Sequence, residues 1–184
     1  MIFSETELAG AYTIDIERHE DARGFFARSF CVEEFAEYGL TTHWVQSNVS
    51  FNEHQATMRG MHWQSPPHEE VKLVRCTQGS IFDVIVDVRA GSATTGRWVG
   101  VELSAQNRRM LYIPGGFAHG FLTTADKTEV FYEMSSPHVP DAARGFCWND
   151  PQLDIAWPGP VNVISDRDAG YPHLDLALIE TETQ

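Results

Sequence analysis

The chain has 184 residues, of which 42% are hydrophobic and 11% aromatic, so it can bury one sizeable core and is not expected to be disordered. Its formal net charge of −13 disfavours non-specific binding to nucleic acid, and no apolar run approaches the roughly 18 residues that a membrane span requires. The three cysteines form no CxxC pair, which is typical of reduced thiols and predicts a cytoplasmic protein.

A short helix is predicted near the N-terminus, over Val32–Tyr38. Val32, Phe35 and Ala36 fall on one helical face, and Gly39 follows as a residue suited to end the helix. This is the one helix that the sequence predicts.

The middle of the chain carries apolar runs that are rich in β-branched residues and separated by turn signals. The predicted strands are Val71–Thr77, Ile81–Val88, Trp98–Leu103, Met110–Ile113 and Val130–Met134. Strands this closely spaced, with almost no helix, indicate an all-β sandwich or small barrel in one domain over residues 1–184. The C-terminal third is predicted to be a Pro- and Trp-rich loop that ends in a tail over residues 174–184, of which the acidic and polar residues 179–184 are predicted to be frayed.

The first candidate for chemistry is the segment Arg59–Gln64, RGMHWQ. In a regular strand, Arg59 points to one face and His62 to the other, together with the small Gly60. His62 then has room beside its imidazole to act as a proton acceptor. A structural histidine that is hydrogen-bonded in the core remains an alternative on this segment alone.

The second candidate is the segment Pro114–Phe121, PGGFAHGF. It resembles the second motif of the cupins, β-barrels with the active site at the mouth. Many cupins bind a metal through an H-x-H pair, but here Gln64 stands two residues after His62. A three-ligand metal site from His62, His119 and either His68 or Glu69 stays open as an alternative.

A longer set of segments resembles the dTDP-4-dehydrorhamnose 3,5-epimerase family, in the family's order. The segments are DARGFF (21–26), QSN (46–48), RGMHWQ (59–64), KLVR (72–75), GSIFDV (79–84), GFAHGF (116–121), WNDP (148–151), IAWP (155–158) and SDRD (165–168). The resemblance implies a cupin-type jelly-roll barrel that removes and returns protons beside a sugar ketone. It implies no metal and no organic cofactor, and the chain has no G-x-G-x-x-G or Walker loop.

The resemblance also assigns the catalytic residues. His62 is implied to be the general base, with Asp168 orienting its ring, and Tyr132 the acid on the opposite face of the sugar. Lys72 and His119 are implied to lie near the ketone oxygen, where negative charge develops in the enolate. A neutral histidine suits proton abstraction near pH 7.

The substrate implied by the resemblance is a nucleotide-diphosphate sugar, and a homodimer is implied as well. Arg23 and Arg59 would bind the diphosphate and Phe26 would stack on the base, with the N-terminal strands of residues 1–50 exchanged between subunits. The remaining substrate-binding positions carried over from the family are Arg28, Gln46, Asn48, His119 and His138.

Two positions depart from the family pattern. Arg28 stands where the family usually has a glutamate, and His138 where it usually has a second tyrosine. Because arginine only donates hydrogen bonds, Arg28 favours cytosine over thymine as the base. His138 leaves open whether C3, C5 or both carbons are inverted.

Two other functions remain as alternatives. One is a nucleotide-sugar 3,4-ketoisomerase, which would share the barrel and a basic histidine. The other is a non-enzymatic barrel that binds sugar nucleotides, which would not need His62, Lys72, Tyr132 and Asp168 together.

Overall fold

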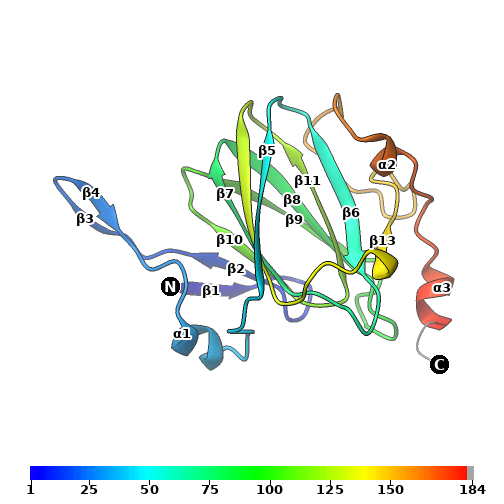
Figure 1. Ribbon diagram of the computed structural model, residues 1–184, viewed down its shortest axis with the longest axis horizontal. Coiled ribbons are helices and arrows are strands. Elements are labelled where there is room, and N and C mark those ends of the chain that lie inside the picture. Colours follow the sequence, from blue (N-terminus) through cyan, green and yellow to red (C-terminus); the bar gives the residue numbers. More distant parts are fainter. Residues whose placement is uncertain (182–184) are drawn as a thin grey trace.

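The computed structural model describes residues 1–181, and it is built mainly of two antiparallel sheets that face each other (Figure 1). The six-stranded sheet has the order β1 (Ile2–Glu5), β2 (Tyr12–Asp15), β10 (Met110–Ile113), β7 (Lys72–Gln78), β12 (Thr128–Met134) and β5 (Gln46–Asn52). The five-stranded sheet has the order β13 (Ala143–Gly145), β6 (Met58–Gln64), β11 (Phe117–Thr123), β8 (Ser80–Asp87) and β9 (Trp98–Ser104). The predicted jelly-roll class is confirmed, and each predicted strand is present within a few residues of its expected bounds.

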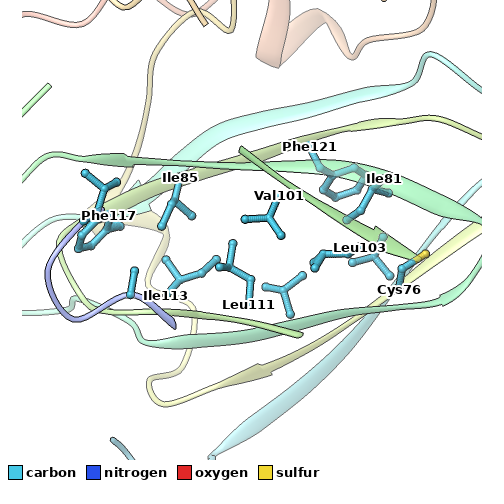
Figure 2. Close-up of a cluster of buried hydrophobic side chains, with 13 residues drawn as sticks. Cys76, Ile81, Ile85, Val101, Leu103, Leu111, Ile113, Phe117 and Phe121 are labelled. Carbon is cyan, nitrogen blue, oxygen red and sulfur yellow. The ribbon is translucent and has the colours of Figure 1, made fainter. Parts of the chain in front are cut away.

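The main core lies between the two sheets, where alternate residues of each strand point inward (Figure 2). The six-stranded sheet contributes residues such as Val74 and Leu111, and the five-stranded sheet contributes Ile81, Ile85 and Phe121, all essentially inaccessible to solvent. This packing fixes the spacing of the strands from which the polar side chains described below project.

A two-stranded hairpin projects from the body of the molecule (Figure 1). It consists of β3 (His19–Asp21) and β4 (Gly24–Phe26), and every residue of both strands is exposed. We call it the arm. Phe25 and Phe26 are 41% and 75% exposed, so β4 presents apolar surface to solvent.

The predicted helix is present as α1 (Val32–Glu37), but its predicted apolar face is wrong. Only Phe35 is buried, while Val32 and Ala36 are exposed. A helix this short presents about one position to the core. Gly39 follows the helix with a φ of 68°, as a helix-ending glycine does.

The C-terminal third is more ordered than predicted. It contains β13, a 3₁₀ turn (Pro140–Ala142), α2 (Asp166–Ala169) and α3 (Leu176–Thr181). Leu174 and Ile179 are buried in a second apolar cluster on the five-stranded sheet, so the prediction that residues 179–184 are frayed is wrong for residues 179 to 181. The rest of that predicted tail, residues 182–184, lies outside the described residues. Within residues 1–181, no helix is long and apolar enough to cross a membrane.

Candidate active site

A cavity of about 610 Å³ opens between the two sheets. Its walls come from β5, β7 and β12 of one sheet and from β6 and β11 of the other, with α2 at one side. The predicted site residues that it brings together are Gln46, Asn48, Arg59, His62, Lys72, His119, Tyr132, His138 and Asp168.

His62 and Asp168 form a hydrogen-bonded pair at the side of this cavity. His62 Nε2 lies 2.8 Å from Asp168 Oδ1, and the backbone N–H of Gly60 donates to Asp168 Oδ2 at 3.1 Å. Burial alone would raise the pKa of Asp168, but the hydrogen bonds from His62 and Gly60 outweigh it and lower the pKa overall. Asp168 is therefore held as a carboxylate, which can accept a hydrogen bond from Nε2–H of His62 and leaves Nδ1 of the ring out of the pair.

Arg59 and His62 both line the cavity, so the prediction that they point to opposite faces is wrong. On β11, His119 is opposite His62, whereas Phe121 is opposite Arg59, so β6 carries one extra residue between two paired positions. Such a bulge turns residues three apart onto the same face. Arg59 then reaches Asn52 Oδ1 with its Nε at 2.7 Å.

Gly60 does not leave room beside the His62 ring, as the alternation had suggested. A Cβ at Gly60 would lie 2.5 Å from Gly120 Cα and 2.9 Å from His119 O, and the residue has a φ of 123°. The space is filled by the backbone of β11, so Gly60 and Gly120 permit the two histidine-bearing strands to approach closely.

A second histidine–aspartate pair lies deeper in the cavity wall. His119 Nε2 is 2.7 Å from Asp83 Oδ1, and the two side chains are 6% and 0% exposed. Asp83 is not among the site residues that the sequence predicts. Its position on β8 between the inward-pointing Ile81 and Ile85 is the signal that could have placed it inside the barrel.

Tyr132 projects from β12 on the sheet that faces β6 and β11. Its ring centre is 6.1 Å from that of His119. Burial first, and then the negative charge of Asp83, raise the pKa of Tyr132 well above its ordinary value, although Arg59 opposes the shift. Tyr132 therefore keeps its proton at neutral pH and can act as a proton donor from the sheet opposite His62.

Lys72 lies in the cavity with Glu70 as its ion-pair partner. The distance from Lys72 Nζ to Glu70 Oε1 is 2.8 Å, and the side chains are 8% and 10% exposed. Glu70, Arg144 and Arg167 also line the cavity, and none of them is predicted from the sequence. Arg144 and Arg167 add positive charge to the cavity wall. The sequence signal for Arg167 was its place beside Asp168.

The three remaining predicted residues lie outside the cavity. Arg23 and Phe26 are on the arm, and Arg28 follows it, with side chains that are strongly exposed. Arg23 pairs with Asp21 on the same hairpin, and Arg28 Nη1 donates to Glu34 Oε1 at 2.6 Å. The isolated chain therefore does not bring these residues to its own site.

The alternative of a three-ligand metal site has no support in the geometry. Within residues 1–181, no group of three or more His, Cys, Asp or Glu side chains is placed to hold a metal ion. His62 and His119 instead each bind an aspartate.

The fold is a cupin-type jelly-roll barrel, and its cavity holds a histidine–aspartate pair and a protonated tyrosine on facing sheets, groups that are suited to acid–base chemistry. The family model of dTDP-4-dehydrorhamnose 3,5-epimerase matches residues 5–175. The chain belongs to this family and is an epimerase, an enzyme of the isomerase class.

Individual relatives agree with this assignment. The dTDP-4-dehydrorhamnose 3,5-epimerase of Sinorhizobium fredii is 39% identical over 175 residues, covering 95% of this chain and 90% of its own length. The crystal structure of the enzyme of that name from Bacillus anthracis, with TDP and PPi bound, superposes with a TM-score of 0.91 at 39% identity, covering 94% of this chain and 99% of its own. ChmJ, a 3'-monoepimerase from Streptomyces bikiniensis in complex with dTDP-quinovose, has a TM-score of 0.85 at 33% identity, covering 94% of this chain and 86% of its own.

Proposed function

We propose that the protein epimerises a 4-keto-6-deoxyhexose carried on a nucleoside diphosphate, in the synthesis of deoxysugars. The observation that carries the proposal is the placement of His62, paired with Asp168 of α2, on one sheet and of protonated Tyr132 on the other, across one cavity. Inversion of a carbon requires removal of a proton from one face and its return to the other. Groups on facing sheets meet that requirement.

In the proposed reaction, Nδ1 of His62 takes the proton from a carbon beside the ketone. The electron pair of the broken C–H bond moves into the ring and onto the ketone oxygen, which gives an enolate. Lys72 and His119 place positive charge and hydrogen-bond donors at that oxygen. The enolate collapses when Tyr132 gives its proton to the opposite face of the carbon, and solvent restores the protonation states. C3, C5 or both can be inverted in this way.

The cavity wall suits an anionic substrate even though the whole chain carries a net charge of −13. Arg59, Arg144 and Arg167 line it, and we propose that Arg59 binds the diphosphate. Gln46, Asn48 and His138 offer polar groups to the sugar or the nucleotide, and Gln46 Nε2 donates to Asn48 Oδ1 at 3.2 Å.

We propose thymine as the base, in place of the cytosine that Arg28 favoured. The guanidinium of Arg28 is occupied by Glu34, and the curated relatives are named for dTDP sugars. Calorimetric titration with dTDP and CDP tests this point. Binding of CDP tenfold tighter than dTDP, about 1.4 kcal/mol, would return the preference to cytosine.

We further propose a homodimer in which the arm of each subunit completes the cavity of the other. The arm presents Phe25 and Phe26 to solvent, and the edge strand β5 presents Val49 and Phe51 beside the cavity, at 59% and 48% exposure. Exposed apolar groups on an edge strand and on a projecting hairpin favour association with a second copy. In the dimer, Arg23 would reach the diphosphate and Phe26 would stack on the base. Light scattering at micromolar concentration should give a dimer mass, and a monomer would contradict the proposal.

A cytoplasmic location is also proposed, since all three cysteines, Cys31, Cys76 and Cys147, are free.

The experiment that tests the proposed function is proton NMR in D₂O with dTDP-4-keto-6-deoxyglucose. Wild-type protein should incorporate deuterium at C3, C5 or both and change their configuration. His62→Ala should abolish exchange at every sugar carbon, with a loss of about 10²–10⁴-fold, whereas Tyr132→Phe should block inversion more than exchange. His43→Ala, at an exposed histidine outside the cavity, is the matched control and should behave as wild type.

Epimerisation at wild-type rate by His62→Ala would contradict the assignment of the base. Movement of the ketone to C3 instead of inversion would identify a 3,4-ketoisomerase, and binding without exchange would identify a sugar-nucleotide-binding protein.

A further inference from the structure

The cavity contains two histidine–aspartate pairs that are bonded through the same ring nitrogen but differ in their surroundings. His62 Nε2 binds Asp168, and His119 Nε2 binds Asp83. His62 is 40% exposed, and Asp168 has a second donor in the backbone N–H of Gly60. His119 and Asp83 are 6% and 0% exposed, and Asp83 Oδ2 is buried without a hydrogen-bond partner.

Asp83 is placed where an ionised carboxylate is costly. It alternates on β8 with Ile81 and Ile85, whose side chains belong to the main core. A buried carboxylate is stable in its charged form only when donors or a counter-charge balance it. Asp83 has one donor, on Oδ1, instead of several, and a positively charged donor at that position would balance the carboxylate.

Two other cations of the cavity, Lys72 and Arg59, have their own partners. Lys72 Nζ binds Glu70 at 2.8 Å, and Arg59 Nε binds Asn52 at 2.7 Å. His119 is the basic group in direct contact with Asp83.

The hydrogen-bond capacity of an imidazole ring leads to the same charge state. A neutral ring that donates Nε2–H to Asp83 has a lone pair on Nδ1, which would repel a ketone or enolate oxygen in the cavity. The imidazolium has an N–H on both nitrogens and can bind Asp83 and the substrate oxygen together. The same bond made by His62 serves the opposite purpose, since a proton acceptor needs the Nδ1 lone pair.

We infer that Asp83 is a positioning residue that holds His119 as an imidazolium, so that His119 donates a charged hydrogen bond to the substrate oxygen while His62 remains neutral as the base. The inference rests on the proposed epimerase function and deepens it. Burial and the number of donors on each aspartate decide the two roles, because the residue types are the same.

The charged and titratable groups packed around His119 set the conditions of the test. They are Asp83 on β8, Tyr132 on β12, and His62, Lys72 and Arg59 on the cavity wall. Tyr132 keeps its proton because burial and the charge of Asp83 raise its pKa, so it adds no charge to the balance near neutral pH.

The test uses full-length protein labelled with ¹⁵N-histidine, because ring-nitrogen NMR distinguishes the imidazolium from both neutral tautomers. At pH 7.5, wild-type His119 should give the imidazolium pattern and His62 a neutral pattern, with His119→Asn and His62→Asn used to assign the signals. Asp83→Asn keeps the shape of the side chain and removes its charge. It should convert His119 to the neutral form, lower kcat about 10²-fold and leave KM within about threefold.

Asp87→Asn is the matched control, because Asp87 is also fully buried on β8 but binds Arg89, Ser92 and Thr94 outside the cavity. It should leave the His119 signals and kcat unchanged. A neutral His119 in wild-type protein overturns the inference even if Asp83→Asn fails to fold. A wild-type protein that holds His119 as an imidazolium but does not epimerise would refute the proposed function and leave the charge assignment standing.

Discussion

Replacement of Gly60 by alanine is expected to lower both stability and activity through one steric clash. The added Cβ would lie 2.5 Å from Gly120 Cα and 2.9 Å from His119 O, and both atoms belong to the backbone of β11. Backbone inside a paired sheet cannot move aside as the end of a flexible side chain can. The strand must therefore shift as a unit or lose its pairing.

The structure allows the size of the effect to be estimated. Overpacking costs about 1–3 kcal/mol, and a side chain at a φ of 123° adds about 1–3 kcal/mol. The sum, about 2–6 kcal/mol, corresponds to a fall in Tm of about 4–24 °C for a chain of this size. Because His119 is the cross-strand partner of His62, the same shift separates the two histidines, and a misplacement of about 1 Å costs about 10²-fold in rate.

The assay combines thermal unfolding at fixed protein concentration with deuterium incorporation into the sugar. Gly91→Ala is the control, since Gly91 has a φ of 69° but no heavy atom within 4 Å of its added Cβ. It should cost about 1–2 kcal/mol through backbone strain alone and leave the rate unchanged. If Gly60→Ala lost no more stability than Gly91→Ala and turned over normally, the close approach of β6 and β11 would not matter for the site.

Two more predictions concern the buried carboxylate of Asp87 and the arm residue Phe26. Burial alone would raise the pKa of Asp87, but hydrogen bonds donated by Arg89, Ser92 and Thr94 lower it from 3.8 to about 2. The charged form therefore contributes about 2 kcal/mol of stability above pH 4, and this contribution is lost as the pH falls towards 2. Denaturant titrations should show Asp87→Asn less stable than wild type at pH 7, with the gap narrowing below pH 4, and a constant gap would contradict this account. Phe26→Ala should weaken dTDP binding by about 1–3 kcal/mol, measured by calorimetry, because stacking on the base is lost. It should leave the Tm of the protein unchanged, because the side chain is 75% exposed in the single chain. Unchanged affinity would argue against the exchange of arms.

The strands that the sequence predicts well are those with a plain physical signal. Val71–Thr77 and Ile81–Val88 are apolar runs that contain several β-branched residues, and they form β7 and β8 within a residue or two. The arm and β1 lack such runs because their residues are partly or wholly exposed, so no hydrophobic pattern marks them. The buried end of the chain, around Leu174 and Ile179, was missed because isolated apolar residues among polar ones look like a tail until the surface that they cover is known.

The candidate site, like the fold, could be predicted from the sequence only in part. Most predicted residues line one cavity, and most of these belong to one of the segments that resemble the family. The face of the sheet to which Arg59 points could not be predicted, because the alternation of residue types does not show the bulge in β6. Arg23 and Phe26 lie outside the cavity for a different reason: their predicted role depends on a second copy of the chain, and no pattern within a single sequence specifies how two copies meet.

Asp83 is a residue whose surroundings the structure shows and the sequence pattern does not. A lone carboxylate between two isoleucines reads as a tolerated exception in a core strand. Inside the barrel, the same position leaves the carboxylate with a single donor, and the charge that it needs can come from the histidine that it contacts. Burial that would destabilise an ordinary core residue then serves to fix the charge of a neighbour, and this is the physical difference between the pair His119–Asp83 and the more exposed pair His62–Asp168. Two pairs of identical composition can in this way act as acid-like and base-like groups in one cavity, with the fold, and not the residue types, assigning the roles.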